Sequence, residues 1–183
     1  MPKLNRTKQA ILGFLIWEPM SGYDIKKAIE YSTSNFWSES YGQIYPILKR
    51  LTEEGLVTQS LLTTSGGRDR HVYTITETGQ EELRRWLSEP TEPSVVRNEL
   101  LLKLFFGRQV AAETNIRQIE TFRNAQQQDL ERYAKIRKEL TTTHKDPADV
   151  AYWLMALRFG ESQKRALLTW CEETLAELHG LAK

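Results

Sequence analysis

The fold is decided by residues 40–55, which read Ser-Tyr-Gly-Gln-Ile-Tyr-Pro-Ile-Leu-Lys-Arg-Leu-Thr-Glu-Glu-Gly. The aliphatic residues of this stretch recur at i, i+3, i+4 and i+7, which places them on one side of a helix: Ile44, Ile47, Leu48 and Leu51. Amide, phenol and cationic side chains remain on the other side and its flanks: Tyr41, Gln43, Tyr45, Lys49 and Arg50. Because these groups suit contacts with base edges and phosphates, we interpret the segment as a DNA-recognition helix.

The start of this helix is left open by Pro46. A proline inside a helix removes a hydrogen bond and clashes with the preceding turn, at a cost of about 3 kcal/mol. A start near Gly42 would bring Pro46 close to the first turn, where the cost is much lower. Ser40 and Gln43, however, have the spacing of a capping box. The sequence does not choose between these two observations.

The flanking sequence completes a small domain. Residues 10–17 read as a short apolar helix, and Ser21 suits the cap of a second one. Gly55 is placed to end the recognition helix. Residues 56–63 and 71–76 then read as two strands joined by a turn rich in Gly and Arg. Three helices followed by a hairpin with a basic tip predict a winged helix.

Five motifs in this region occur together in one order. They are Ala-Ile-Leu-Gly-Phe-Leu (10–15), Ser-Gly-Tyr-Asp-Ile (21–25), Gln-Ile-Tyr-Pro-Ile-Leu-Lys-Arg-Leu (43–51), Glu-Glu-Gly-Leu-Val (53–57) and Gly-Arg-Asp-Arg-His-Val-Tyr-Thr-Ile-Thr (67–76). Together they resemble the PadR family of bacterial transcriptional regulators. The wing departs from the family pattern, since Asp69 takes the place of the proline in the usual Gly-Arg-Pro.

The resemblance implies a homodimer, often a repressor released by a small molecule. It implies a mainly α protein with a small β-hairpin. The expected organisation is a winged helix-turn-helix domain at 1–88, a linker at 89–97 and an antiparallel helical dimerisation domain at 98–183. Two prolines support the linker, because they disfavour helix and stiffen the chain.

Roles in binding double-stranded DNA follow as hypotheses. A two-fold axis would place two recognition helices in successive major grooves about 34 Å apart, so the expected operator is an inverted repeat. Gln43 would bond bidentately to adenine, and Lys49 or Arg50 would read guanine or hold phosphate. Tyr41 and Tyr45 would pack on the backbone or on a thymine methyl group.

Outside the recognition helix, a second set of residues is suited to the DNA backbone. Ser21 and Tyr23 would hold phosphate at the start of the second helix, with Lys26 beside them. Arg68 and Arg70 would enter the minor groove or follow its phosphates. The alternatives are a solubilising turn for the arginines, a solvated face for the lysine, and packing inside the domain for the tyrosines.

The C-terminal half reads as helices that need a partner. Residues 98–106 suggest a largely buried helix, and 111–140 a long one with few apolar residues. Asp146 and the proline after it mark the start of a final helix. Its apolar stripe is the expected dimer seam: Trp153, Leu157, Leu168, Cys171 and Leu175. The alternative is that this stripe closes onto the subunit's own helices.

Ligand control is a further hypothesis. Trp37, Phe105 and Trp153 are aromatic residues near the expected junction of the domains, and Arg158 would meet a carboxylate. A small aromatic acid bound there would change the spacing of the two recognition helices. The alternative is that these aromatic residues belong to the core. A second alternative for the protein is a winged helix that acts through a protein partner, with no effector.

Composition excludes several classes of protein. The 183 residues carry a net charge of only +1, so DNA binding must depend on local cations. Cys171 is the single cysteine, which excludes an intramolecular disulfide, and no apolar run approaches the ~18 residues of a membrane span. We expect a cytoplasmic protein. There is no phosphate loop, dinucleotide turn or nucleophile elbow, and the histidines lack metal-ligand spacing, so we expect no enzyme, cofactor or metal.

Overall fold

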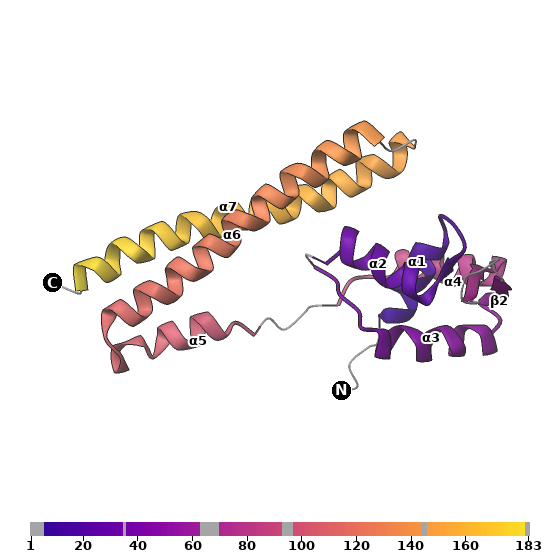
Figure 1. Ribbon diagram of the computed structural model, residues 1–183, viewed down its shortest axis with the longest axis horizontal. Helices are drawn as coiled ribbons and strands as arrows, with labels where there is room; N and C mark the ends of the chain where they lie inside the picture. The colour runs from indigo at the N-terminus through magenta and orange to yellow at the C-terminus, as the bar shows by residue number, and fades with distance from the viewer. Residues whose placement is uncertain (1–5, 35, 63–69, 93–96, 144–145, 182–183) are drawn as a thin grey trace. The chain divides into compact units, whose positions relative to one another are not determined.

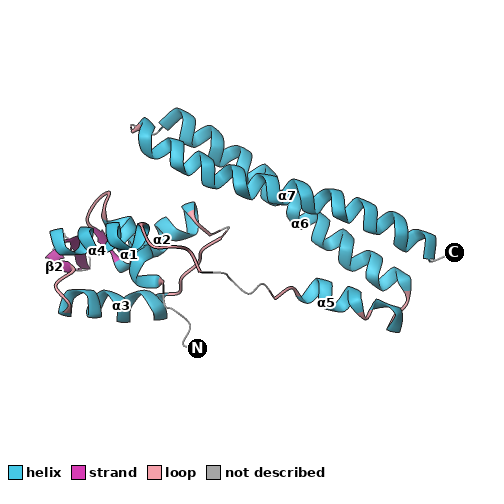
Figure 2. Ribbon diagram, turned by 180° about the vertical axis from the view of Figure 1, so that it is seen from behind, coloured by secondary structure: helices cyan, strands magenta, loops and turns pink. Residues whose placement is uncertain are grey.

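The computed structural model divides into two compact units, Met1–Pro93 and Ser94–Lys183. It describes residues 6–34, 36–62, 70–92, 97–143 and 146–181. The first unit combines helices with a small sheet, and the second is helical (Figures 1 and 2). In the described parts of the chain, no helix is both long and apolar enough to cross a membrane.

The first unit is a winged helix, as the sequence predicted. Its helices are α1 (Thr7–Leu15), α2 (Gly22–Ser32), α3 (Tyr41–Glu53) and α4 (Glu77–Leu87). Its strands are β1 (Met20–Ser21), β2 (Val57–Leu62) and β3 (Arg70–Ile75). They form an antiparallel sheet in the order β1-β3-β2. One core joins helices and sheet, and its fully buried members include Ile11, Ile25, Ile44 and Leu48.

The ends of α3 settle the question that Pro46 raised. The helix begins at Tyr41 with Ser40 as its N-cap, and Pro46 lies inside it. At the other end, Gly55 has a φ of 71°, the left-handed conformation that glycine adopts without strain. The Leu56 N–H bonds to the Leu51 carbonyl (2.9 Å), and the Gly55 N–H bonds to the Thr52 carbonyl (3.1 Å). This Schellman motif satisfies carbonyls that the end of the helix leaves free.

The sheet is larger than the predicted hairpin. β1 adds a third strand, in which Met20 pairs with Tyr73 and Ser21 with Val72. The helix after the sheet is capped by Thr76, whose hydroxyl accepts a hydrogen bond from the Gly79 N–H (3.1 Å) and donates one to the Gly55 carbonyl (2.8 Å).

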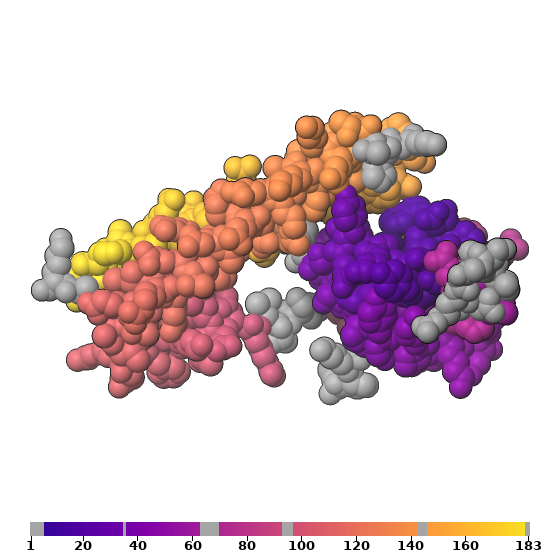
Figure 3. Space-filling model, in the orientation of Figure 1, coloured from indigo at the N-terminus to yellow at the C-terminus, as the bar shows by residue number. Residues whose placement is uncertain are grey.

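The second unit is built on an antiparallel pair of long helices. Its elements are α5 (Glu99–Phe105), a 3-10 turn η1 (Gly107–Gln109), α6 (Ala112–Thr143) and α7 (Pro147–Leu181). Figures 1 and 3 show α6 and α7 side by side along their length, with α5 against one end of the pair. The Asp146 carboxylate accepts a hydrogen bond from the Ala148 N–H (2.9 Å), as expected for an N-cap.

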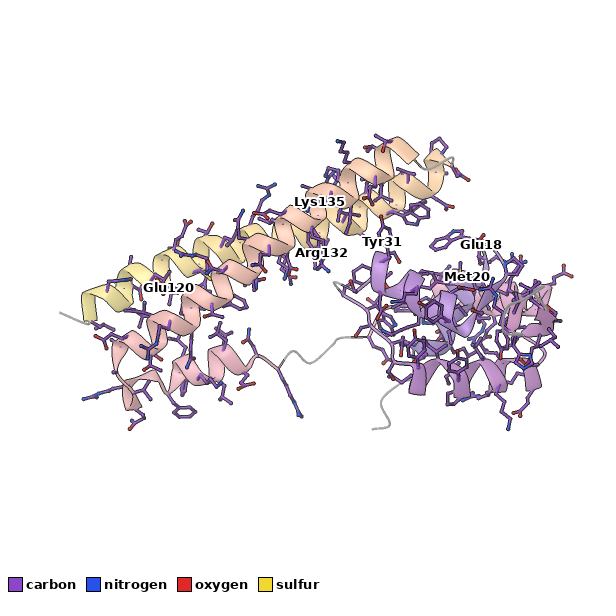
Figure 4. All side chains as sticks on the ribbon, in the orientation of Figure 1. Glu18, Met20, Tyr31, Glu120, Arg132 and Lys135 are labelled. Carbon is purple, nitrogen blue, oxygen red and sulfur yellow. The ribbon has the colours of Figure 1, made fainter. Side chains whose placement is uncertain are left out.

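The seam between α6 and α7 is apolar near α5 and polar at its centre. Ile119, Cys171, Leu175 and Leu178 form the apolar cluster. At the centre, the Lys164 ammonium bonds to Asp129 (2.7 Å) and to the side-chain oxygen of Gln126 (2.8 Å). In Figure 4, Arg132 lies on the same stretch of α6, where its guanidinium bonds to the other Asp129 oxygen (2.9 Å).

Burial corrects two expectations about this unit. Leu157, Cys171 and Leu175 are buried within the subunit, so their side chains close onto the subunit's own helices rather than onto a partner. Trp153 and Leu168 are only partly covered. The α5 helix has no buried residue, and its Phe105 side chain is 82% exposed. An apolar pattern therefore identified the helix correctly but gave the wrong extent of its burial.

Candidate nucleic-acid interface

The exposed side of α3 carries the predicted recognition residues. Ile44, Leu48 and Leu51 face the core, which holds the helix in place and turns Tyr41 and Tyr45 outward. The polar residues of α3 thus share a surface that the rest of the first unit does not cover. This arrangement is what base-edge and phosphate contacts require.

The two cations of α3 differ in how they are paired. The Arg50 guanidinium bonds to the Glu54 carboxylate at 2.6 Å, and this hydrogen bond raises the pKa of Arg50 and lowers that of Glu54. Lys49 lies 3.9 Å from Glu53, a loose pair on an exposed side chain. Lys49 is therefore only loosely paired, whereas the charge of Arg50 is partly offset by the carboxylate bound to its Nε.

Gln43 has a structural role that the sequence only hinted at. Its side-chain oxygen accepts hydrogen bonds from the Ser40 N–H (2.8 Å) and the Ser40 hydroxyl (2.8 Å). A bidentate contact with adenine needs the amide oxygen as well as the amide nitrogen. The predicted readout by Gln43 therefore requires the capping box to open.

Three tyrosines form a stacked row across α2 and α3. The rings of Tyr23 and Tyr41 are 6.3 Å apart with an interplanar angle of 11°, and those of Tyr41 and Tyr45 are 6.2 Å apart at 24°. Gly22 makes room for the row, since a Cβ on it would lie 2.7 Å from a Tyr45 ring carbon. All three side chains are exposed, so the row borders the surface of α3 rather than filling the core.

The start of α2 does not match its predicted role. Ser21 is only 5% exposed, and its hydroxyl donates a hydrogen bond to Asp24 Oδ2 (2.7 Å) within a capping box. The expectation that Ser21 holds phosphate is corrected accordingly, because its hydroxyl is buried and bound to a carboxylate. Arg70 of β3 also reaches this carboxylate, at 3.5 Å.

Lys26, the lysine of α2 expected to contact DNA, is less accessible than its neighbour Lys27. Lys26 is largely covered, with its side chain 15% exposed and 2.9 Å from Glu30. Lys27 is more accessible and lies over the Tyr23 ring at 5.7 Å. A hydrogen bond with Glu30 raises the pKa of Lys27. Lys27 was not among the expected site residues. It is nevertheless the lysine of α2 that is exposed beside the tyrosine row. In the sequence, two adjacent lysines are the only sign of this difference.

The wing is described only along its strands. The pairing of β2 with β3 runs from Val57 opposite Ile75 to Leu62 opposite Arg70. Arg68, expected in the minor groove, lies outside the described residues. Of the two arginines predicted for the wing, Arg70 is therefore the one that can be placed, at the start of β3 and exposed.

The residues expected to bind an effector are divided between the two units, and those of the second unit are not gathered into one site. Trp37 belongs to the first unit, where its indole N–H donates a hydrogen bond to Glu39 (2.9 Å). Glu39 is only 4% exposed, so this contact holds the Trp37 ring against the first unit. In the second unit, Phe105 lies at the α5 end, while Trp153 and Arg158 lie near the other end of α7. Among the described residues, no cluster of His, Cys, Asp or Glu is arranged to hold a metal ion.

Sequence comparisons cover both units of the chain. Residues 11–85 match the transcriptional regulator PadR-like family, and residues 96–179 match the virulence activator alpha C-terminal family. The negative transcriptional regulator PadR of Bacillus subtilis is 33% identical over 176 residues, which cover 92% of this chain and 95% of the relative. The probable transcriptional regulator Rv1176c of Mycobacterium tuberculosis is 25% identical over 183 residues, with the same coverage.

Solved structures of similar proteins have the same fold. Bacillus subtilis PadR in complex with operator DNA has a TM-score of 0.82 at 28% identity, covering 93% of this chain and 98% of that one. The same protein with p-coumaric acid scores 0.75 at 26% identity, covering 98% and 99%. The Vibrio cholerae virulence activator AphA scores 0.72 at 28% identity, covering 96% and 99%. These relatives are regulators of transcription and not enzymes, and this chain belongs to the PadR-like family of transcriptional regulators.

Proposed function

We propose that the protein is a sequence-specific DNA-binding repressor that acts as a homodimer on an inverted-repeat operator. The observation that carries the proposal is the exposed side of α3, where Tyr41, Tyr45 and Lys49 share a surface held in place by the opposite, buried side. The structure of Bacillus subtilis PadR with operator DNA supports it, because that protein shares fold and family with this chain.

Within this proposal, the residues of the surface have different roles. Lys49 and Arg50 both contact DNA, and Glu54, which is bound to Arg50 Nε in the free protein, competes with phosphate for Arg50. The tyrosine row supplies contacts to the sugar-phosphate backbone from α2 and α3 together. Lys27 and Arg70 add cations beside the first turns of α2, while Gln43 holds the start of the recognition helix.

The homodimer is supported by the apolar surface of the second unit. Leu101, Leu102 and Phe105 are exposed on α5 although a monomer would be expected to bury such residues. A second copy related by two-fold symmetry would cover apolar surface on both chains at once. It would also present two α3 helices to successive major grooves, about 34 Å apart.

Release by a small aromatic effector is the third part of the proposal. Its support is the structure of Bacillus subtilis PadR with p-coumaric acid. Titration of the operator complex with p-coumaric acid tests this part separately: a fall in DNA affinity is expected, and unchanged affinity at millimolar acid would remove the effector from the proposal.

Fluorescence anisotropy with DNA from upstream of the protein's own gene tests DNA binding. Excess competitor DNA and a salt series separate specific from general attraction. We expect Lys49→Ala to weaken binding and to lower the slope of log K against log salt by about one. Lys103→Ala, which removes a cation of α5 in the second unit, is the matched control.

A second experiment follows if no binding is found. If the protein does not bind this DNA, a selection from random DNA sequences follows. Failure of that selection would contradict the repressor proposal and favour a winged helix that acts through a protein partner.

A further inference from the structure

A hollow of about 740 Å³ lies in the second unit, between α5, η1, the start of α6 and the last turns of α7. Leu104, Trp170 and Leu178 give it an apolar wall, while Glu173 and Glu177 stand on its α7 side. Its size suits one or two aromatic side chains, and the described chain does not fill it. We call it the α5 hollow.

An exposed apolar stripe lies on the first turns of α7. Tyr152, Met155 and Phe159 are 72%, 54% and 68% exposed. Their spacing of three and four residues puts them on one side of the helix. Leu157, between them in sequence, faces α6 instead, so the stripe points away from the seam.

The stripe and the α5 hollow lie on the same side of α7. Trp170, Glu173 and Glu177 each follow one residue of the stripe, Tyr152, Met155 and Phe159 respectively, by 18 residues. Eighteen residues are five full turns of an α-helix, so each pair has the same direction around the axis. Between the two sets, this side of α7 carries the uncharged residues Ser162, Gln163 and Ala166.

We propose that two copies of α7 pack antiparallel through this side, so that the stripe of each copy fills the α5 hollow of the other. This interlock rests on the proposed homodimer and names its contact surfaces. A two-fold axis beside Gln163 and Ala166 sets Phe159 opposite the partner's Trp170 and Tyr152 opposite the partner's Glu177. One side of one helix then supplies both halves of an isologous interface.

Charge at the edge of the stripe fits this arrangement. Arg158 and Glu173 are both exposed and form no ion pair with the described residues. Within one chain they are 15 residues apart on a single helix, about 22 Å along its axis, too far for contact. In the antiparallel pair, Arg158 lies within one turn of the partner's Glu173, on the same flank. The interlock therefore gives Arg158 an ion pair across the two-fold axis instead of an effector contact.

A charge swap tests the interlock without DNA. Arg158→Glu and Glu173→Arg each set like charges against each other twice in the homodimer, so each variant should have a dimer dissociation constant raised by about tenfold or more. An equimolar mixture of the two variants restores both ion pairs. Native mass spectrometry of differently tagged chains should then show the mixed dimer in excess over either homodimer, and the double variant should dimerise like the wild type.

The outcomes separate the interlock from the homodimer itself. A wild type that sediments as a monomer at micromolar concentration contradicts the homodimer and the interlock together. Dimeric variants that mix only statistically, with unchanged dissociation constants, leave the homodimer standing and overturn the interlock. Lys135→Glu, a charge reversal at an exposed residue of α6 (Figure 4), is the control and should leave dimerisation unchanged.

Discussion

Gly160 on α7 lies directly against the ring of Tyr133 on α6. A Cβ at residue 160 would come within 2.9 Å of a ring carbon, and Tyr133 is 1% exposed, so its ring has no free space into which to move. Glycine at this position sets how closely the two helices approach.

Gly160→Ala should therefore destabilise the helical pair. Overpacking costs about 1–3 kcal/mol, and the better helix propensity of alanine returns about 1 kcal/mol, so we expect a net loss of up to about 2 kcal/mol. Urea unfolding followed by circular dichroism measures it. Gly180→Ala on the same helix is the control, since no atom lies within 4 Å of its Cβ position. Equal stability of the two variants would show that the Tyr133 ring can shift to accept a Cβ at residue 160.

Lys164→Met should destabilise the centre of the same seam by about 1–3 kcal/mol. The change leaves Gln126 Oε1 and one Asp129 oxygen without the ammonium that bonds to both. Lys103→Met provides the comparison, because its pair with Glu99 at 2.7 Å is exposed and should contribute less than about 1 kcal/mol. If both variants lost the same free energy of unfolding, the half-buried contacts of Lys164 would stabilise the fold no more than an exposed ion pair does.

Gln43→Ala should lower the free energy of unfolding by about 0.5–2 kcal/mol, because the Ser40 N–H and hydroxyl lose their acceptor. Gln43→Glu keeps a side-chain oxygen at the same place and should retain the stability of the wild type. Thermal unfolding of the two variants and the wild type measures this difference in stability. If alanine and glutamate cost the same, the capping box does not stabilise α3.

Glu54→Gln should strengthen operator binding. Glu54 holds Arg50 at 2.6 Å and Lys8 at 3.1 Å, so loss of its charge frees cations for phosphate. We expect a several-fold higher affinity at fixed salt, measured by the anisotropy assay, because the carboxylate no longer competes with phosphate for these cations. Glu89→Gln, which removes a carboxylate bonded to Arg85 on α4, is the matched change away from α3. An unchanged affinity for the operator would show that Glu54 does not compete with phosphate for Arg50.

Acid should lower the free energy of unfolding of the first unit, because Glu54 and Glu82 have lowered pKa values. Hydrogen bonds from Arg50 and then Lys8 lower the pKa of Glu54, and bonds from Arg85 and then Lys8 lower that of Glu82. A lowered pKa stabilises the fold above the unfolded value of about 4.3 and ceases to do so as pH falls through the folded value. Melting temperatures from pH 7 to pH 3 should fall below about pH 4.5. The fall should be shallower in Glu54→Gln/Glu82→Gln, and identical profiles would contradict this account.

Local signals in the sequence were sufficient for much of the first unit. The cap at Ser21, the apolar side of α3 and the glycine at residue 55 each act through residues a few positions apart, so their spacing can be read directly. Strand β1 was missed because two residues carry no periodicity, and its pairing with β3 depends on chain more than fifty residues away.

Predictions failed where the outcome depended on neighbours in space. Ser21 has the residue type and position of a phosphate contact, but the carboxylate of Asp24 occupies its hydroxyl. Helix α5 has the composition of a buried helix, yet the described residues of the second unit leave Phe105 exposed. Cys171 and Leu175 lie on an apolar side of α7 as expected, but α6 of the same subunit covers that side. Spacing identifies an apolar side and not the surface that meets it.

Strand β1 also has a mechanical consequence. Ser21 is the last residue of β1 and the N-cap of α2, and it pairs with Val72 of β3, so the helix entry and the wing strand share one backbone junction. Arg70 ties the same strand to Asp24 in the first turn of α2. We therefore expect the wing strand and the start of α2 to move together, so that in the proposed complex with DNA a shift of this strand would also reposition the helix that packs against α3.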